Sequence, residues 1–374
     1  MTMKMNYRNF FQDKTAADNG DFLKVIAVSA VFLQSILGFA LNAHPNTDTQ
    51  IRIGISYNVV KFSAPAFIFS ILFTNTRYNL GTKFNTKKFY LKILRSSFFP
   101  YYLWGIIYLL LFPNLQQINH YHNFQSFLWQ LISGNAAPHL WYAVMMLQFL
   151  VLMPLFNLLV KWIDFNFQLR VKKFIFYLII ILILSASWLI FYDCLIFHGP
   201  KMHDWYLFDR FFMSFALYGF LGVLCAIFFE FYCDFLSKWK YSIVAILILS
   251  FIVINLELFQ FGLPLNLANA PYYKPSMTFY DLSVIFLISL FAIHVGPRFK
   301  KTSYLIHKLA QIAYLAYLPN AMWSWILWNL FGKILFQQVP FLSILIIYCL
   351  TWILSFITAF LSSPIFIKAK KNLA

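Results

Sequence analysis

Long apolar runs recur along the whole chain, and each has about the length of a bilayer-spanning helix. A helix needs roughly 20 apolar residues to cross the hydrocarbon core, and runs of roughly 18 to 22 residues alternate here with short polar loops. Because 61% of the 374 residues are apolar and only 11% are charged, a soluble globular fold is excluded. The pattern predicts an all-α, polytopic bundle of transmembrane helices.

About ten spans can be placed along the chain. Residues 1–20 are polar and residues 368–374 form a basic tail, so residues 21–367 are predicted to be one membrane domain. The first apolar run is long and lacks a small-residue cleavage site, so we expect it to remain as a span. The spans are expected at about residues 22–41, 57–73, 98–112, 139–160, 174–192, 211–229, 241–256, 277–295, 309–331 and 341–360.

Basic residues are concentrated on one side of the predicted membrane. If the amino terminus is cytoplasmic and ten spans alternate, the inward segments contain all but six of the 29 Lys and Arg residues. Basic loops stay on the inner side, so this asymmetry predicts that both termini are cytoplasmic. The net charge of +17 then sets topology, and we expect a lipid bilayer and no nucleic acid as partner. The six exceptions are Arg52, Lys61, Lys201, Arg210, Lys274 and Lys333.

Neither the cysteines nor the histidines are spaced as metal ligands. The four cysteines include no CxxC pair, so we expect neither a disulfide framework nor a metal centre. No two histidines have the spacing of a zinc site, and outside the fourth span we interpret them as solvated. These are His44, His120, His122, His198 and His203 in the predicted outer loops, and His294 and His307 near the inner face.

The fourth span begins with a group of aromatic and titratable side chains. The apolar run 134–156 opens with the sequence Pro-His-Leu-Trp-Tyr, which contains His139 and Trp141. An imidazole at the edge of the hydrocarbon can exchange a proton with its surroundings, while the neighbouring rings fix the depth of the helix. Interfacial anchoring explains the same residues without any chemistry. His139 is therefore either a base or an anchor.

Two polar points lie deep inside predicted spans. Gln34 and Ser35 come ten and eleven residues after Lys24, which begins the first span, and so lie about 15 to 16 Å deeper at helical rise. Asn320 lies at a similar depth in the ninth span and follows Pro319, which frees a backbone carbonyl. We expect these side chains to meet at one level. They either line a site or join helices by hydrogen bonds worth about 0.6 to 2 kcal/mol each.

A basic stretch follows the second span. Between Arg77 and Arg95, lysines alternate with aromatic and aliphatic residues, a pattern typical of an amphipathic helix on the inner leaflet. Such a helix by itself fixes topology. Alternatively, Lys88, Lys92 and Arg95 hold an anionic, phosphate-bearing donor at the cytoplasmic face. Lys24 then belongs to the same donor site.

Three residues on the predicted outer side are candidates for substrate binding. Lys61 lies a few residues into the second span, and Arg210 follows Asp209 at the start of the sixth. Each can bind a glycan or a carboxylate, or can extend its charged group to the interface while its stem stays in hydrocarbon. Trp141, at the start of the fourth span, is the third candidate.

Six stretches of the chain occur in a set order: DFLKVIAVSAVFL, KFSAPAFIF, FYLKILRSSFFPYYLW, HLWY from His139 to Tyr142, DRFFMSFALYGFLGVLCA and AYLAYLPNAMW. Together they resemble the acyltransferase type 3 family, integral-membrane enzymes that acylate surface sugars and glycans. HLWY is similar to that family's HLWF stretch, and AYLAYLPNAMW is similar to its YGIYLIHP motif. The resemblance covers nearly the whole chain.

The resemblance implies an O-acyltransferase of the bacterial cytoplasmic membrane. Such an enzyme takes an acyl group, acetyl or similar, from a cytoplasmic acyl-CoA and needs no tightly bound cofactor. It passes the group to a hydroxyl of a cell-surface glycan or teichoic-type polymer. Lys24 stands at the place of the family's first-span basic residue.

Ser35 and Asn320 stand where the family has histidines, so the resemblance leaves His139 as the base at the membrane edge. Gln34, Ser35 and Asn320 then supply hydrogen bonds around the reacting group.

Two further classes of function have to be weighed against this enzyme. A homologue without the two histidines can act without catalysis, as an export or assembly partner of other cell-envelope proteins, or as a lipid or glycan binder. A secondary transporter is disfavoured, because we find neither an internal repeat nor more than a few charged residues at mid-membrane depth.

Overall fold

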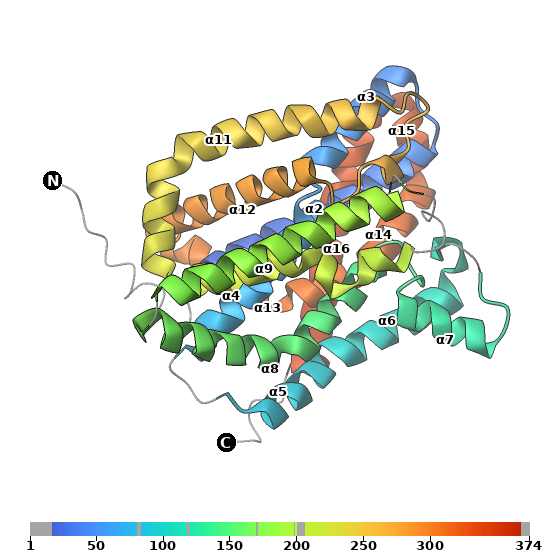
Figure 1. Ribbon diagram of the computed structural model, residues 1–374. Coiled ribbons are helices and arrows are strands. Elements are labelled where there is room, and N and C mark those ends of the chain that lie inside the picture. The colour runs from blue at the N-terminus through green and yellow to red at the C-terminus, as the bar shows by residue number, and fades with distance from the viewer. Residues whose placement is uncertain are drawn as a thin grey trace.

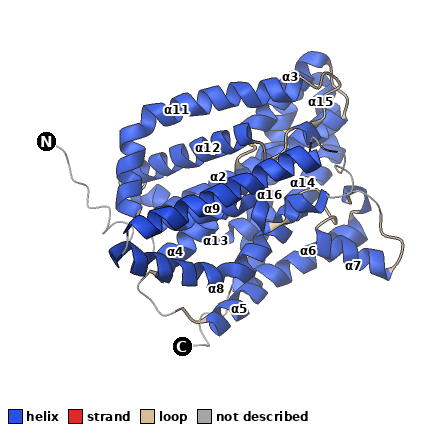
Figure 2. Cartoon of the chain, viewed as in Figure 1, coloured by secondary structure: helices blue, strands red, loops and turns tan. Residues whose placement is uncertain are grey.

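A computed structural model describes residues 17–80, 84–117, 120–169, 171–197, 199 and 206–367. All regular elements in these ranges are helical, and the described chain contains no strand (Figure 2). The predicted all-α fold class is therefore confirmed.

The helices differ widely in length. In chain order they are α2 (Asn19–Asn42), α3 (Thr47–Val59), α4 (Ser63–Asn79), α5 (Thr86–Ile93), α6 (Phe99–Leu111), α7 (Phe124–Ser133), α8 (Leu140–Leu169), α9 (Val171–Tyr192), α10 (Ala216–Ile227), α11 (Phe229–Phe259), α12 (Pro275–Val295), α13 (Lys300–Tyr317), α14 (Asn320–Leu327), α15 (Lys333–Gln338) and α16 (Pro340–Ile367). Short 3₁₀ turns lie at Pro113–Leu115, Tyr206–Arg210, Phe212–Phe215 and Leu267–Asn269, and π-helical turns at Leu94–Phe98, Asp193–Phe197 and Trp328–Gly332.

Six segments of the described chain are long and apolar enough to cross a membrane. They are Asn19–Asn42, Thr47–Asn79, Leu140–Ile163, Phe229–Phe259, Pro275–Val295 and Pro340–Phe366. The other four predicted spans fall on α6, α9, α10 and the α13–α14 pair, which are not among these six. The chain is thus a multi-pass membrane protein, while the count of ten spans and the cytoplasmic position of the termini stay predictions.

Helix α2 is the central element of the bundle. It packs against α4, α12, α13, α14 and α16, and Figure 1 shows it running between these neighbours. Its start is fixed by a capping box, in which Asp18 accepts from the N–H of Asp21 at 2.8 Å and Asp21 accepts from the N–H of Asp18. A helix contacted on so many sides positions its polar residues against several partners.

The expected second span is broken into two helices. Helix α3 ends at Val59 and α4 begins at Ser63, so Lys61 lies in the turn between them. The amide of Gln34 donates to the Val60 carbonyl at 2.6 Å and to the Ser63 hydroxyl at 3.0 Å. The predicted span at 57–73 lies within the apolar segment Thr47–Asn79, and its helix is interrupted at residues 60–62. Pro65 cannot donate to the Lys61 carbonyl, and the side chain of Gln34 bonds the backbone at the break.

The basic stretch is not one separate helix. Arg77 belongs to the last turn of α4, Lys87, Lys88 and Lys92 lie on α5, and Arg95 lies on the π-helical turn that follows. Helix α5 continues through the π-helical turn Leu94–Phe98 into α6, with helical backbone at both junctions. The predicted helix from Arg77 to Arg95 is therefore wrong in its bounds. Its basic part, α5, is the first segment of a continuous helical stretch that leads into α6, the third predicted span.

Helix α7 turns back along α6, which the sequence analysis did not anticipate. The hydroxyl of Tyr101 donates to the Leu131 carbonyl at 2.6 Å, and a Cβ on Gly105 would come within 2.7 Å of the Leu131 side chain. Tyr101 lies ten residues before the end of α6 at Leu111, which is about 15 Å along the helix. Residues 134–139 therefore start α8 from inside the bundle.

Helices α4 and α10 approach each other closely at a glycine. A Cβ on Gly222 would lie 2.5 Å from the backbone oxygen of Phe69, whereas a Cβ on Gly38 of α2 would meet nothing within 4 Å. Gly222→Ala should therefore force the two helices apart and cost about 1 to 3 kcal/mol. Gly38→Ala should be neutral or raise stability by up to about 1 kcal/mol through helix propensity.

Thermal unfolding of the two purified variants in the same detergent tests this packing. We expect a lowered Tm for Gly222→Ala and an equal or higher Tm for Gly38→Ala. Equal Tm values for Gly222→Ala and the parent protein would contradict the described contact between α4 and α10.

Candidate functional site

The break between α13 and α14 forms the centre of the candidate site. Helix α13 ends at Tyr317 and α14 begins at Asn320, directly after Pro319, so the Leu318 carbonyl and the Met322 N–H lie at the break and are not bonded to each other. The Tyr108 hydroxyl of α6 bridges these two groups: it donates to Leu318 O at 2.7 Å and accepts from Met322 N at 3.2 Å. That Pro319 frees a backbone carbonyl stays a prediction, because the N–H that proline lacks would have bonded Leu315 O, four residues earlier.

His139 binds the same carbonyl. Its Nε2 lies 3.1 Å from Leu318 O, and since a carbonyl can only accept, Nε2 is the nitrogen that donates. The other ring nitrogen, Nδ1, is buried without a hydrogen-bond partner. A buried N–H without a partner is costly, so the ring is neutral and Nδ1 has a free lone pair. In this tautomer Nδ1 is a candidate proton acceptor.

Aromatic rings enclose His139. Tyr108 and Tyr317 contact its ring edge to face, with centroid distances of 5.5 and 5.0 Å, and the Tyr317 hydroxyl donates to the His139 carbonyl. Only 6% of His139 is exposed. His139 is thus buried against protein, and both interpretations of it, as a base and as an interfacial anchor, stay predictions.

Ser35 and Asn320 are in contact, as expected from their similar predicted depths. The Ser35 hydroxyl donates to Asn320 Oδ1 at 3.0 Å, and the Asn320 amide donates to the Tyr317 carbonyl. These bonds connect α2 to the broken helix beside His139. Gln34 points elsewhere, because besides the α3–α4 turn it contacts the hydroxyl of Tyr272, which donates to its Oε1 at 3.3 Å.

Lys61 and Trp141, two of the proposed substrate-binding residues, meet at Tyr272. The Lys61 ammonium lies over the Tyr272 ring at 4.0 Å and over the Tyr57 ring at 4.8 Å, with Tyr57 Oη 3.4 Å away. The ring of Trp141 lies 5.5 Å from that of Tyr272 and 6.2 Å from that of Phe215. Lys61 is only 5% exposed, so its charge is stabilised by aromatic faces and does not reach water by snorkelling.

Asp281 is a buried charged residue that the sequence analysis missed. It is fully buried on α12, accepts from the Tyr218 hydroxyl at 3.3 Å, and has no partner for Oδ1. Within the described ranges, no ion pair joins Asp281 to Lys61. An Asp within the apolar run 277–295 was the available signal, because an ionisable residue inside a span is a functional candidate by default.

Arg210 is engaged by the loop that leads to His139. Its guanidinium donates to the Ser133 carbonyl, to Asn135 Oδ1 at 2.6 Å and to Asp209 at 3.2 Å, and the residue is 6% exposed. Gln148 of α8 donates to the Arg210 carbonyl at 2.6 Å. The proposed substrate ligand Arg210 therefore fastens the end of α7 to the segment before α10.

Lys24 lies in a polar cluster at the other end of α2. Its ammonium is 3.4 Å from Asp21 and 3.3 Å from the Thr74 hydroxyl, and Asp21 also pairs with His307 at 2.7 Å. Burial raises the pKa of nearby Asp18 to about 6, and the charge of Asp21 adds to the rise. His307 was interpreted as solvated, which is wrong, because it joins α13 to α2.

The other proposed donor-binding residues are exposed. Lys88 and Lys92 lie on the surface of α5 and Arg95 on the π-helical turn after it. Within the described ranges, no hydrogen bond or ion pair joins Lys24 to any of them. The candidate residues thus form one group near Leu318 and another around Tyr272. The four proposed donor-binding residues lie in two separate places, Lys24 on α2 and the other three on α5 and the turn after it.

The remaining histidines form no site in the described chain. His44, His120, His122 and His294 are exposed, while His198 and His203 lie outside the described residues. No three His, Cys, Asp or Glu side chains within the described ranges come together as metal ligands.

The sequence profile of the acyltransferase domain matches residues 19–360, which is nearly the whole chain. No match was found among curated proteins or among solved structures. The matched region contains the first five spanning segments, most of the sixth, and every candidate residue described above. The chain therefore belongs to the acyltransferase type 3 family, as the resemblance of its motifs implied.

Proposed function

We propose that this acyltransferase-like membrane protein moves an acyl group, acetyl or similar, from a cytoplasmic acyl-CoA to a hydroxyl of a cell-surface glycan or teichoic-type polymer. The new ester forms as the thioester breaks, and coenzyme A leaves as the thiol. The family match over residues 19–360 supports acyl transfer, and the free Nδ1 of His139 is the single observation that supports a catalytic centre.

The proton balance assigns the role of His139. The acceptor hydroxyl loses its proton as it attacks the thioester carbonyl, and Nδ1 of His139 accepts that proton while Nε2 stays bonded to Leu318 O. The proton then goes to the leaving thiolate. Nδ1 is buried, so neighbouring side chains must move before an acceptor hydroxyl can reach it.

The polar residues around His139 are assigned to positioning. Ser35 and Asn320 bond to each other and hold α2 against α14, and Gln34 holds the α3–α4 turn. In the proposal, their hydroxyl and amide groups orient the acyl group by hydrogen bonds and exchange no protons.

The aromatic and charged group around Tyr272 is assigned to the acceptor. Lys61 and Trp141 both contact that ring, and an aromatic face with a nearby ammonium suits the apolar face and hydroxyl groups of a sugar. Lys24, Lys88, Lys92 and Arg95 are assigned to the phosphates of the donor by their charge. We place the protein in the bacterial cytoplasmic membrane, with both termini inside.

A specific observation favours a second function without catalysis. Ser35 and Asn320 stand at the positions of two family histidines. The Ser35 hydroxyl donates to Asn320, and the Asn320 amide donates to the Tyr317 carbonyl. A chain that keeps the family fold through such bonds can bind lipid or glycan, or assist polymer export with other envelope proteins, without acyl transfer.

The first test changes the proposed base in the native host. A strain deleted for this gene is complemented with the parent gene or with His139→Gln, and alkali-labile acyl groups on purified surface glycans are measured. Glutamine can still donate to Leu318 O but takes no proton, so we expect the acylation rate to fall by about 10² to 10⁴-fold at equal membrane content.

His122→Gln is the matched control, because this histidine is exposed, and it should acylate like the parent. Unchanged acylation in His139→Gln removes that residue from the mechanism. Unchanged acylation in the deletion strain, with an altered amount of exported polymer, supports the non-catalytic function.

The second test concerns the donor. In the double variant Lys88→Gln with Lys92→Gln, loss of two exposed positive charges should raise the apparent KM for acyl-CoA by about tenfold at low salt, with a smaller effect at high salt. Initial rates are measured in inside-out vesicles against acyl-CoA concentration at two ionic strengths.

The exposed pair Lys300 and Lys301 at the start of α13 provides a control with the same loss of charge. Lys300→Gln with Lys301→Gln should leave the KM unchanged. An equal rise in both double variants would show that only net charge matters and would remove Lys88 and Lys92 from the donor site.

A further inference from the structure

Helix α7 has two different faces. Leu131 and Gln130 are buried against the bundle, as is Ser133 at the end of the helix. The opposite side exposes large apolar residues at helical spacing, whose exposed fractions are 76% for Phe124, 40% for Leu128, 48% for Trp129 and 59% for Ile132. In a water-soluble loop, a helix would carry charged groups on its exposed side.

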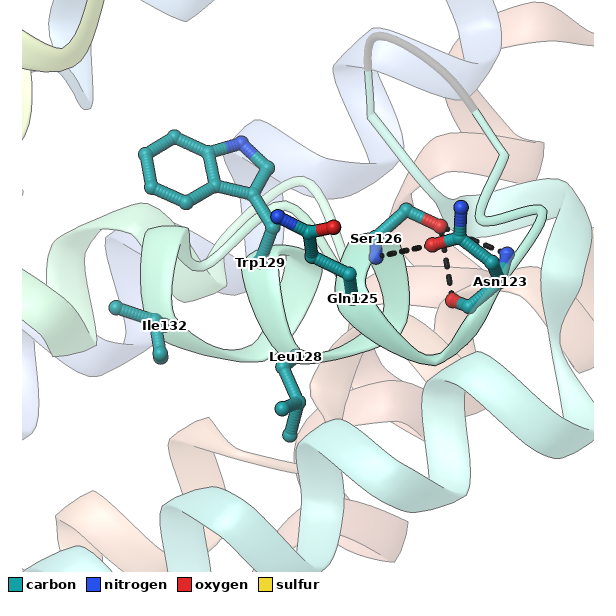
Figure 3. A pocket seen from close by; sticks show the side chains of 6 residues that line it. All are labelled: Asn123, Gln125, Ser126, Leu128, Trp129 and Ile132. Atoms are coloured by element: carbon teal, nitrogen blue, oxygen red, sulfur yellow. Dashed lines mark hydrogen bonds between the residues drawn. The ribbon is translucent and has the colours of Figure 1, made fainter.

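A shallow groove runs along this exposed side. It is lined by Asn123, Gln125, Ser126, Leu128, Trp129 and Ile132. Figure 3 shows the polar side chains at the amino-terminal end of α7, where Asn123 and Ser126 form the capping box, and the apolar side chains further along the helix. The groove therefore changes from polar to apolar in one direction, as the region between lipid headgroups and hydrocarbon does.

The sequence around α7 carries no formal charge. Between Arg95 and Lys161 there is not one Asp, Glu, Lys or Arg residue, although this stretch includes both loops that flank α7. The neighbouring α6, against which α7 lies, exposes its own apolar side chains, including Ile106 and Leu110. The exposed surface of such an uncharged segment, which continues the apolar surface of α6, is suited to contact with hydrocarbon and not with water.

We propose that the exposed face of α7 is a docking surface for membrane lipid, whose acyl chains lie along Leu128, Trp129 and Ile132 while the headgroup lies near Asn123 and Ser126. Helix α7 is thus a re-entrant helix embedded in the bilayer. Arg210 binds Ser133 and Asn135 at its end, so the lipid-covered helix supports the loop that carries His139.

Site-directed spin labelling tests this proposal in the full chain. Cys194, Cys225, Cys233 and Cys349 are replaced, single cysteines are introduced by Leu128→Cys or Ile132→Cys, and the labelled protein is reconstituted into phosphatidylethanolamine–phosphatidylglycerol vesicles. Collision of the label with oxygen reports hydrocarbon, and collision with a soluble nickel chelate reports water. The exposed positions Leu110→Cys on α6 and Asn114→Cys in the following turn serve as the lipid and water references.

We expect the labels at positions 128 and 132 to match Leu110→Cys, with a several-fold higher ratio of oxygen to nickel accessibility than Asn114→Cys. Nickel accessibility equal to that of Asn114→Cys would overturn the proposal. Exclusion of both reagents would also overturn it, since a protein surface would then cover α7. Neither readout depends on acyl transfer, so this test and the test of the proposed function can fail separately.

A second measurement avoids the cysteine replacements. In vesicles of lipids brominated along their chains, the parent protein should lose a larger share of its tryptophan fluorescence than Trp129→Phe does. Equal quenching of the two proteins would place Trp129 away from the acyl chains.

Discussion

The structure depends on one backbone carbonyl. Helix α13 ends at Tyr317, just before Pro319, and at this break Leu318 O has no helical partner. The side chains of Tyr108 and His139 both bind it. Three helical segments that are distant in the sequence thereby meet at one atom. An unpaired carbonyl in hydrocarbon costs several kcal/mol, so the break is stable only because α6 and the start of α8 supply donors.

The same requirement explains the arrangement around this carbonyl. Gln34 supplies a donor to the broken backbone at Val60, as Tyr108 does at Leu318. Each break makes a place where polar groups lie deep in the bundle without a net charge. Lys61 and Asp281 are the exceptions, and aromatic rings and hydroxyl groups surround them in place of a direct ion pair. Part of the candidate site therefore lies beside two interrupted helices, at Val60 and at Leu318.

Depth along a helix could be predicted from the sequence, and lateral packing could not. The contact between Ser35 and Asn320 follows from helical rise, because both residues lie about eleven residues from the predicted inner ends of their spans. An interruption of the helix at Pro319 follows from the chemistry of proline. The aromatic enclosure of His139 could not be predicted, because it depends on the contact of Tyr101 with Leu131 that turns α7 back along α6.

Other differences have the same origin. The break at Val60 has a local signal in Pro65, which cannot donate to the Lys61 carbonyl, but the bond from Gln34 to Val60 O could not be read from the sequence. Asp281 was visible in the sequence as a charge in an apolar run, but its distance from Lys61 along the chain gave no reason to connect the two. The basic residues of α5 were recognised, while their continuity with α6 depends on a π-helical turn that spacing does not reveal. Tertiary contacts decide each of these features.

A double-mutant cycle between Tyr108 and Pro319 tests the central claim most directly. In the parent protein, Tyr108→Phe removes one hydroxyl and leaves both Leu318 O and Met322 N without that partner, so it should cost about 1 to 3 kcal/mol of unfolding free energy. In a Pro319→Ala background, Leu318 O can bond Met322 N directly, and Tyr108→Phe should then cost much less. An equal cost in both backgrounds would contradict the claim that the proline break is what binds Tyr108 to this carbonyl.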